Sequence, residues 1–225
     1  MTLVLTNDDG IDAPGIRALL KAVNGQGVIV APKAHLSGCG HQVTTTQPIH
    51  IEQRSPVEFA IAGTPADCIR IAISHISPKV KLVLSGINAG GNMGADTYIS
   101  GTVAAVREAA LHRVPGIAIS HYRKGKRNVE WDVAARWTAN VLAEIRQRPV
   151  LPGTFWNVNL PHLEPGEPDP EIVFCEPCTQ PLPVKYRVEG ENLFYVGEYA
   201  LRDRTPGTDV DVCFSGRIAV SLIKL

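Results

Sequence analysis

Over roughly its first 160 residues, the chain alternates between short apolar runs and segments of helical periodicity. An apolar run of about five residues that is bounded by turn residues is typical of a strand buried on both faces of a sheet. Strands that alternate with helices in this way form a parallel sheet covered by helices on both faces. We therefore expect an α/β fold of the Rossmann-like, three-layer type over residues 1–160. The predicted strands lie near 3–5, 27–31, 58–62, 81–84, 116–120 and 156–160.

The first predicted strand ends in two adjacent carboxylates. Asp8 and Asp9 follow the apolar run Leu3–Leu5, and a helix is expected to begin near Pro14, with Asp12 as its N-cap. Asn-Asp-Asp-Gly is also an ordinary turn sequence. The position after a first buried strand favours a functional interpretation, because open α/β sheets bind ligands at the carboxyl ends of their strands.

Two further local predictions concern the region after the second strand. Thr64, Pro65 and Asp67 have the spacing of a capping box, with Thr64 as N-cap of a helix that continues to about residue 76. The β-branched residues of 44–51 suggest an edge strand.

The last third of the chain has a different character. Beyond Pro161, frequent prolines interrupt the sequence and little helical periodicity remains. Residues 185–189 and 193–199 read as a β-hairpin, and 217–225 as a final strand that packs back on the core. We expect 161–225 to be a β-rich extension of the same domain, with a protruding hairpin at about 185–199.

Composition excludes several classes of protein. Lys and Arg total 22, as do Asp and Glu, so no global field attracts nucleic acid or an anionic membrane. The basic run 123–127 is interpreted as a solvated loop. We find no stretch of roughly 18 apolar residues, which a transmembrane helix needs. Five cysteines, an odd number, without an apparent signal peptide favour a reducing cytoplasm.

Polar residues follow three of the predicted strands at the same edge of the sheet. Asp8 and Asp9 offer carboxylate oxygens, Asn88 an amide oxygen and Ser37 a hydroxyl. Two neighbouring carboxylates repel each other unless one is protonated or a cation lies between them. A set of oxygen ligands suits Mg²⁺, Mn²⁺ or Ca²⁺ and not a structural zinc site. The sequence therefore predicts a divalent cation site here.

A second feature lies close to these residues in the expected fold. Ser100, Gly101 and Thr102 open a helix, where free backbone N–H groups can bind a phosphate. Ordinary helix capping is the alternative interpretation of Ser100 and Thr102. His35 and His41 lie in the same region and are interpreted as exposed or structural residues. A cation site beside an anion site is the arrangement that hydrolysis of a phosphate ester needs.

Several longer motifs occur in one order along the chain. They are Thr6–Gly10 with Ala13–Gly15, Ala31–Pro32 with Ser37–Gly38, Gly63–Cys68, Val83–Gly94, Tyr98–Val103, Asn157–Pro161 and Pro206–Asp209. On these motifs the chain resembles the SurE survival-protein family of 5′/3′-nucleotidases.

The resemblance implies an activity and a set of site residues. The activity is that of a metal-dependent phosphomonoesterase, a 5′-nucleotidase that also accepts nucleoside 3′-monophosphates and, in some members, short polyphosphate. The family's metal ligands fall on Asp8, Asp9, Ser37 and Asn88, with Asp8 and Asp9 as the catalytic pair and one Mg²⁺ or Mn²⁺ per subunit. Its phosphate contacts fall on Asn92, Ser100, Gly101 and Thr102. It also implies a homodimer or homotetramer in which the hairpin reaches a neighbouring subunit.

Two departures from the family pattern bear on specificity and assembly. The family usually has an acidic and arginine-rich run where this chain has Lys33–Leu36, and many relatives continue beyond the position of Leu225. A nucleotide- or phosphate-binding paralogue with weak or no turnover is the alternative function. A phosphatase with an aspartyl nucleophile is disfavoured, because position 10 is Gly and not a second Asp.

Overall fold

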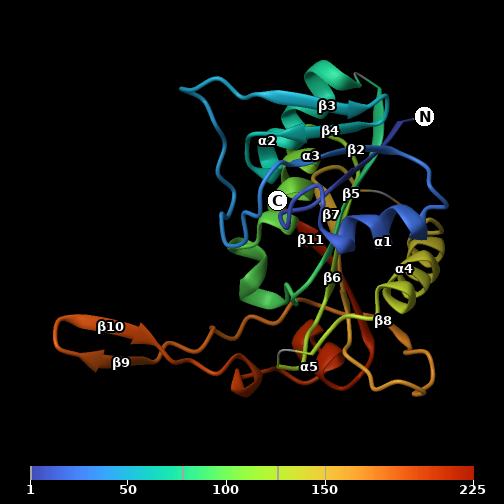
Figure 1. The fold of residues 1–225 in the computed structure, drawn as a ribbon. Helices are drawn as coiled ribbons and strands as arrows, with labels where there is room; N and C mark the ends of the chain where they lie inside the picture. The colour runs from blue at the N-terminus through green and yellow to red at the C-terminus, as the bar shows by residue number, and fades with distance from the viewer. Residues whose placement is uncertain (1, 78, 126, 150) are drawn as a thin grey trace.

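Nine strands form one sheet in the computed structural model, which describes residues 2–77, 79–125, 127–149 and 151–225 (Figure 1). Lys126, part of the basic run, lies outside the described residues. Across the sheet the strands are β3 (Ile51–Ser55), β4 (Glu58–Ile61), β2 (Val28–Pro32), β1 (Thr2–Thr6), β5 (Val80–Asn88), β6 (Gly116–His121), β7 (Thr154–Leu160), β11 (Ile218–Lys224) and β8 (Ile172–Phe174).

The six strands from β4 to β7 run parallel and form the centre of the sheet. Strand β1 shows why three successive residues in its middle, Leu3–Leu5, are all apolar. Leu5 packs in the core on one face of the sheet, and Val4 packs in the core on the other face. A central parallel strand has no solvent-facing side, so the pattern does not alternate with polar residues.

Helices cover both faces of the sheet. Helices α1 (Pro14–Ala22) and α4 (Trp131–Ile145) pack against each other on one face, and α2 (Pro65–Ile71) and α3 (Gly101–Leu111) pack on the other. This arrangement confirms the predicted three-layer α/β fold.

Of the two predicted helix starts, that of α2 is confirmed and that of α1 is wrong. Thr64 Oγ1 accepts from the Asp67 N–H, and Asp67 Oδ2 accepts from the Thr64 N–H, which is the predicted capping box. Helix α2 ends at Ile71 and continues as a short π-helical segment, η1 (Ala72–Ile76). The N-cap of α1 is Ala13 and not Asp12, because the helix begins at Pro14 and Ala13 is the residue before it; the Asp12 carboxylate accepts from Arg54.

The predicted edge strand over 44–51 is also wrong. Thr44 is held by Asp67, which accepts from both its N–H and its hydroxyl at 2.8 Å, so this segment is fixed to the start of α2. The edge strand begins only at Ile51 and pairs antiparallel with β4 across a turn at 56–57.

The C-terminal region completes the main sheet and adds a second, small one. Strand β11 pairs antiparallel with β7 and parallel with β8, so it lies inside the sheet and not at its edge. Strands β9 (Tyr186–Glu189) and β10 (Asn192–Tyr195) form the predicted hairpin, which protrudes from the body of the molecule (Figure 1). Helix α5 (Asp209–Phe214) and strand β8 were not expected from the sequence.

The order of the strands defines where a ligand can bind. From β1 the chain passes through α1 to β2 on one side, whereas β5, on the other side of β1, leads through α3 to β6. The direction of winding thus reverses between β1 and β5, and the space beyond their carboxyl ends is the topological switch point where open α/β sheets bind ligands. None of the described helices has the length and apolar character needed to cross a membrane.

Candidate active site at the switch point

One pocket of about 540 Å³ lies at this switch point and contains most of the predicted site residues. We call Asp8, Ser37, Asn88, Asn92 and Ser100 its polar floor. Asp9, Gly101 and Thr102 are sequence neighbours of floor residues that do not line the pocket themselves. Residues more than 90 positions apart are therefore brought together by the carboxyl ends of β1 and β5 and by the start of α3.

Asp8 is buried at the centre of this floor. Its carboxylate accepts from the Thr102 hydroxyl at 2.5 Å, and its backbone carbonyl accepts from the Leu36 N–H at 2.8 Å. Burial raises the pKa of Asp8, and the neighbouring Asp9 carboxylate raises it further, while hydrogen bonds from Thr102 act in the opposite direction. A cation in the pocket would remove the cost of holding this carboxylate ionised.

Asp9 contacts two loops, the one after β5 through Ala89 and the one after β2 through His35. Its Oδ2 accepts weakly from the Ala89 N–H at 3.4 Å, and its Oδ1 lies 3.3 Å from His35 Nδ1. The His35 side chain is largely exposed, as expected from the sequence. His41 has a structural role, because its Nε2 lies 2.8 Å from the buried Glu108 carboxylate on α3.

The donor set suits a hard cation. Asn88 uses its Nδ2 to donate to the Gly90 carbonyl at 2.8 Å, which leaves its Oδ1 available as a ligand. Within the described part of the chain, no three or more His, Cys, Asp or Glu side chains are arranged to hold a metal ion. The candidate ligands are instead two carboxylates, Asp8 and Asp9, with the neutral oxygens of Ser37 and Asn88. Mg²⁺ is typically bound by one or two carboxylates while it keeps several waters.

Helix α3 begins directly against Asp8. Ser100 is its N-cap and accepts from the Val103 N–H at 3.1 Å, as the capping interpretation predicts, but its hydroxyl proton remains free to donate into the pocket. A Cβ on Gly101 would lie 2.8 Å from the Asp8 Cβ and 2.9 Å from Cys39 Sγ. Only glycine allows the helix and the carboxylate to approach this closely. Thr102 is fully buried, and its side chain holds Asp8.

Asn92 is held by buried polar residues that the sequence reasoning did not identify as part of the site. Its N–H donates to Asn159 Oδ1 at 2.8 Å, and its carbonyl accepts from Asn157 at 2.7 Å and from Asn159 at 3.1 Å. Its side-chain Nδ2 donates to the Ser120 hydroxyl at 2.8 Å, which leaves the second amide proton for the pocket. Two asparagines at alternate positions of a buried strand, β7, were the signal that could have indicated this role.

The same pocket also has apolar lining residues that sequence reasoning missed. We call this set the apolar wall: Ile99, Leu182, Pro183, Tyr195 and Tyr199. Four of these residues come from the segments that lead into and out of the hairpin, 80 or more positions after the floor residues. Nothing in the local sequence indicates that these segments return to the switch point.

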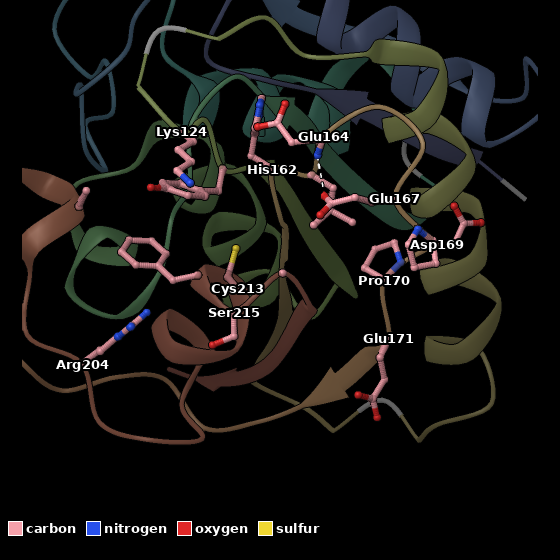
Figure 2. Close-up of a pocket in the computed structure, with 16 residues that line it drawn as sticks. Lys124, His162, Glu164, Glu167, Asp169, Pro170, Glu171, Arg204, Cys213 and Ser215 are labelled. Carbon is pink, nitrogen blue, oxygen red and sulfur yellow. Dashed lines mark hydrogen bonds between the residues drawn. The ribbon is translucent and has the colours of Figure 1, made fainter.

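A larger cleft of about 650 Å³ lies elsewhere, beyond the ends of β6 and β7 (Figure 2). His162, Glu164, Glu167, Asp169 and Lys124 line it, and none of the predicted site residues does. Two of its acids are already paired, Asp169 with Arg136 at 2.5 Å and Glu164 with Arg127. We therefore place the candidate active site in the smaller pocket, where the buried carboxylate has no cationic partner among the described contacts.

The fold and the pocket together define a class: an α/β protein of the Rossmann-like type with an acidic, oxygen-rich pocket at the switch point of its sheet. A sequence model of the family described as survival protein SurE matches residues 3–181. The chain therefore belongs to the SurE family, and the predicted resemblance is confirmed.

Individual relatives support this assignment over the whole chain. A protein of Nostoc sp. (strain PCC 7120) named "Putative 5'-nucleotidase alr3139" is 67% identical over the full length of both chains. The 5′-nucleotidase SurE of Allorhizobium ampelinum is 36% identical across all of this chain and 92% of its own. The crystal structure of the SurE protein from Aquifex aeolicus superposes with a TM-score of 0.85 at 29% identity, covering 100% of this chain and 93% of that one.

Proposed function

We propose that this chain is a 5′-nucleotidase: a metal-dependent phosphomonoesterase that hydrolyses nucleoside 5′-monophosphates, and also 3′-monophosphates, to nucleoside and phosphate. Homology supports the 5′-nucleotidase class, because relatives aligned over the whole chain carry this name. The single observation that supports the chemistry is the buried Asp8 beside Asp9, placed against the start of α3 in one pocket.

Asp8, Asp9, Ser37 and Asn88 would hold one divalent cation, Mg²⁺ or Mn²⁺. When bound, such a cation supplies Lewis acidity, which lowers the pKa of water and screens the charge of phosphoryl oxygens. Asp8 is kept in place for this role by Thr102, and Asp9 by the contacts of its carboxylate with Ala89 and His35.

The phosphate of the substrate would lie in the pocket, beside Asp8 and the start of α3. Ser100 donates its hydroxyl, the backbone N–H groups at Gly101 and Thr102 provide the positive end of the helix, and Asn92 donates its amide. Because Asn157 and Asn159 fix both backbone groups of Asn92, its side chain meets the phosphate without reorganisation.

Three further properties belong to this proposal as expectations from the sequence. They are a homodimer or homotetramer, a cytoplasmic location and activity on short polyphosphate. The division into a core of residues 1–160 and an extension of 161–225 within one domain is likewise kept as a proposal.

A substrate panel tests the proposed activity. Purified protein is assayed with nucleoside 5′- and 3′-monophosphates, short polyphosphate and p-nitrophenyl phosphate, first with Mn²⁺ or Mg²⁺ and then with EDTA. We expect release of phosphate from the nucleotides that EDTA abolishes and added metal restores. Tight nucleotide binding without turnover would instead support the binding paralogue, and full activity in EDTA would overturn the metal dependence.

A further inference from the structure

The apolar wall lines the same pocket as the polar floor and has a different chemistry. The floor groups can bind a phosphate and a cation, whereas Leu182, Pro183 and the ring of Tyr195 offer apolar and aromatic surface in the same pocket. A substrate whose phosphate rests on the floor therefore directs its ester group toward an apolar, partly aromatic surface.

Tyr195 is an exposed aromatic residue with a fixed orientation. It is 56% exposed, yet its hydroxyl donates to the Pro183 carbonyl at 2.8 Å, so the ring is tied to the opposite segment of the hairpin base. The ring also meets Tyr186 edge-to-face, with centroids 5.7 Å apart. An oriented ring of this kind is a ready surface for stacking.

The base of the hairpin is anchored to the body beside the pocket. The Val196 N–H donates to the Lys185 carbonyl at 2.9 Å and closes the hairpin. A few residues further on, Tyr199 and Arg202 donate to Asp96 Oδ2 at 2.5 and 2.7 Å, and the Arg202 side chain is fully buried. Tyr199, at one end of the wall, is therefore fixed to the body of the molecule, and Asp96, an acid that also lines the pocket, is balanced by Arg202.

From this geometry we infer that the base of the hairpin is the nucleoside subsite and that Tyr195 is the platform on which the nucleobase stacks. This inference rests on the proposed function, since it assumes that the phosphate binds on the polar floor. A planar, neutral ring is favoured over a charged group, because the wall offers aromatic and aliphatic surface and its neighbouring charge is already paired. Tyr195 is then a specificity-determining residue that does not touch the reacting atoms.

The test compares Tyr195→Ala with Tyr195→Phe and with Phe194→Ala as a matched control. Phe194 is the neighbouring aromatic residue of β10, it points to the opposite face of the hairpin, and it does not line the pocket. The substrates are AMP, UMP and ribose 5-phosphate, which share a sugar 5′-phosphate and differ in the presence and size of the base.

Stacking of a base on an aromatic side chain corresponds to about a 10-fold or larger change in affinity. We expect Tyr195→Ala to raise KM for AMP by about this factor, to raise KM for UMP less, and to leave KM for ribose 5-phosphate and all kcat values near parental. Tyr195→Phe retains the ring but loses the hydrogen bond to Pro183, so its KM for AMP should lie between those of the parent and Tyr195→Ala. Phe194→Ala should keep the parental KM. An unchanged KM for AMP in Tyr195→Ala, or an equal rise for ribose 5-phosphate, would overturn the inference.

Calorimetric titration with AMP in EDTA separates this inference from the proposed function. Weaker binding by Tyr195→Ala than by the parent and Phe194→Ala supports the subsite even if no variant hydrolyses AMP. Equal binding by all three proteins refutes the subsite, while metal-dependent hydrolysis by the parent would still support the nucleotidase.

Discussion

Asp8 is buried beside a second carboxylate and is nevertheless hydrogen-bonded in a way that favours its charged form. Its raised pKa means that the metal-free protein is stabilised by this group only at low pH, and that this contribution is lost as the pH rises through the folded-state value. At neutral pH the carboxylate is therefore a local cost, which a bound cation would offset.

This leads to a prediction for Asp8→Asn, with Asp12→Asn as control. The substitution removes a charge and a strong oxygen ligand, so metal affinity by calorimetry should fall, and turnover with Mn²⁺ should drop roughly 100-fold or more. The variant should melt at or above the temperature of the metal-free parent, because the amide oxygen can still accept from Thr102. Asp12 is an exposed acid outside the pocket and should be replaceable without loss.

Asp9→Asn should show the same combination of lost activity and retained fold. Near-parental turnover in either pocket variant would mean that the two carboxylates do not hold the catalytic cation.

His121 gives a prediction about pH and stability. Burial, with smaller contributions from the nearby His162 and Arg123, lowers the pKa of this imidazole to about 4, although the hydrogen bond to the Tyr122 carbonyl acts in the opposite direction. Since the unfolded-state value is near 6.5, the unfolded chain binds the proton first, and stability should fall as the pH drops from about 6.5 toward 4.

His121→Asn keeps a donor for Tyr122 and removes the titrating group. Urea unfolding at about pH 7 and about pH 4.5 should show that the parent loses about 2 kcal/mol more than the variant. If both proteins lost the same unfolding free energy between these pH values, His121 would not be the group that causes the loss of stability at low pH. His162, whose pKa burial also lowers, stays in both proteins.

At the scale of elements, the start of α3 belongs to the proposed phosphate site and also packs against Asp8, a proposed ligand of the cation. Gly101 occupies the first turn of the helix, where alanine would normally favour helix formation by up to about 1 kcal/mol. Here the added Cβ would lie within 3 Å of both Asp8 and Cys39, so steric conflict decides the outcome.

Gly101→Ala should therefore displace Asp8 and weaken both metal and phosphate binding. Calorimetric titration with Mn²⁺, and inhibition of turnover by inorganic phosphate, would each detect the change. Parental affinities in Gly101→Ala would contradict the close packing described for this helix.

The elements also show what the sequence could and could not predict. Strands such as β1 and the capping box at Thr64 were predictable, because the signal lies within a few neighbouring residues. Asp12 was misassigned because the N-cap is the residue directly before Pro14, which is Ala13. Helix α5 has six residues and is too short to show a period.

The same distinction holds for the site. The polar floor was predictable because its residues follow successive strands of a recognisable parallel sheet. The apolar wall and the two asparagines that hold Asn92 depend on long-range contacts that no local pattern encodes.

At the scale of the whole molecule, the hairpin is the part that a single subunit leaves uncovered. Val188 and Leu193 lie opposite each other on β9 and β10, and they are 67% and 64% exposed. An isolated two-stranded hairpin is marginal in water. Contact with a neighbouring subunit would cover these side chains.

Val188→Ser with Leu193→Ser should therefore reduce the mass measured by light scattering, while Tyr195 and the pocket remain unchanged. The single variant Val57→Ser, in the exposed turn between β3 and β4, is a control for the loss of a surface valine. An unchanged mass in the double variant would exclude this face of the hairpin from the assembly.

The separation of polar floor and apolar wall along the chain has an evolutionary consequence. Floor residues all lie between positions 8 and 100, and the hairpin part of the wall lies between 182 and 199. Mutations in the later stretch can alter which leaving group is preferred without disturbing the groups that act on phosphorus. Related proteins that share the same hydrolytic residues can thus come to prefer different substrates. Exchanging hairpin bases between such proteins is a direct route to engineered selectivity.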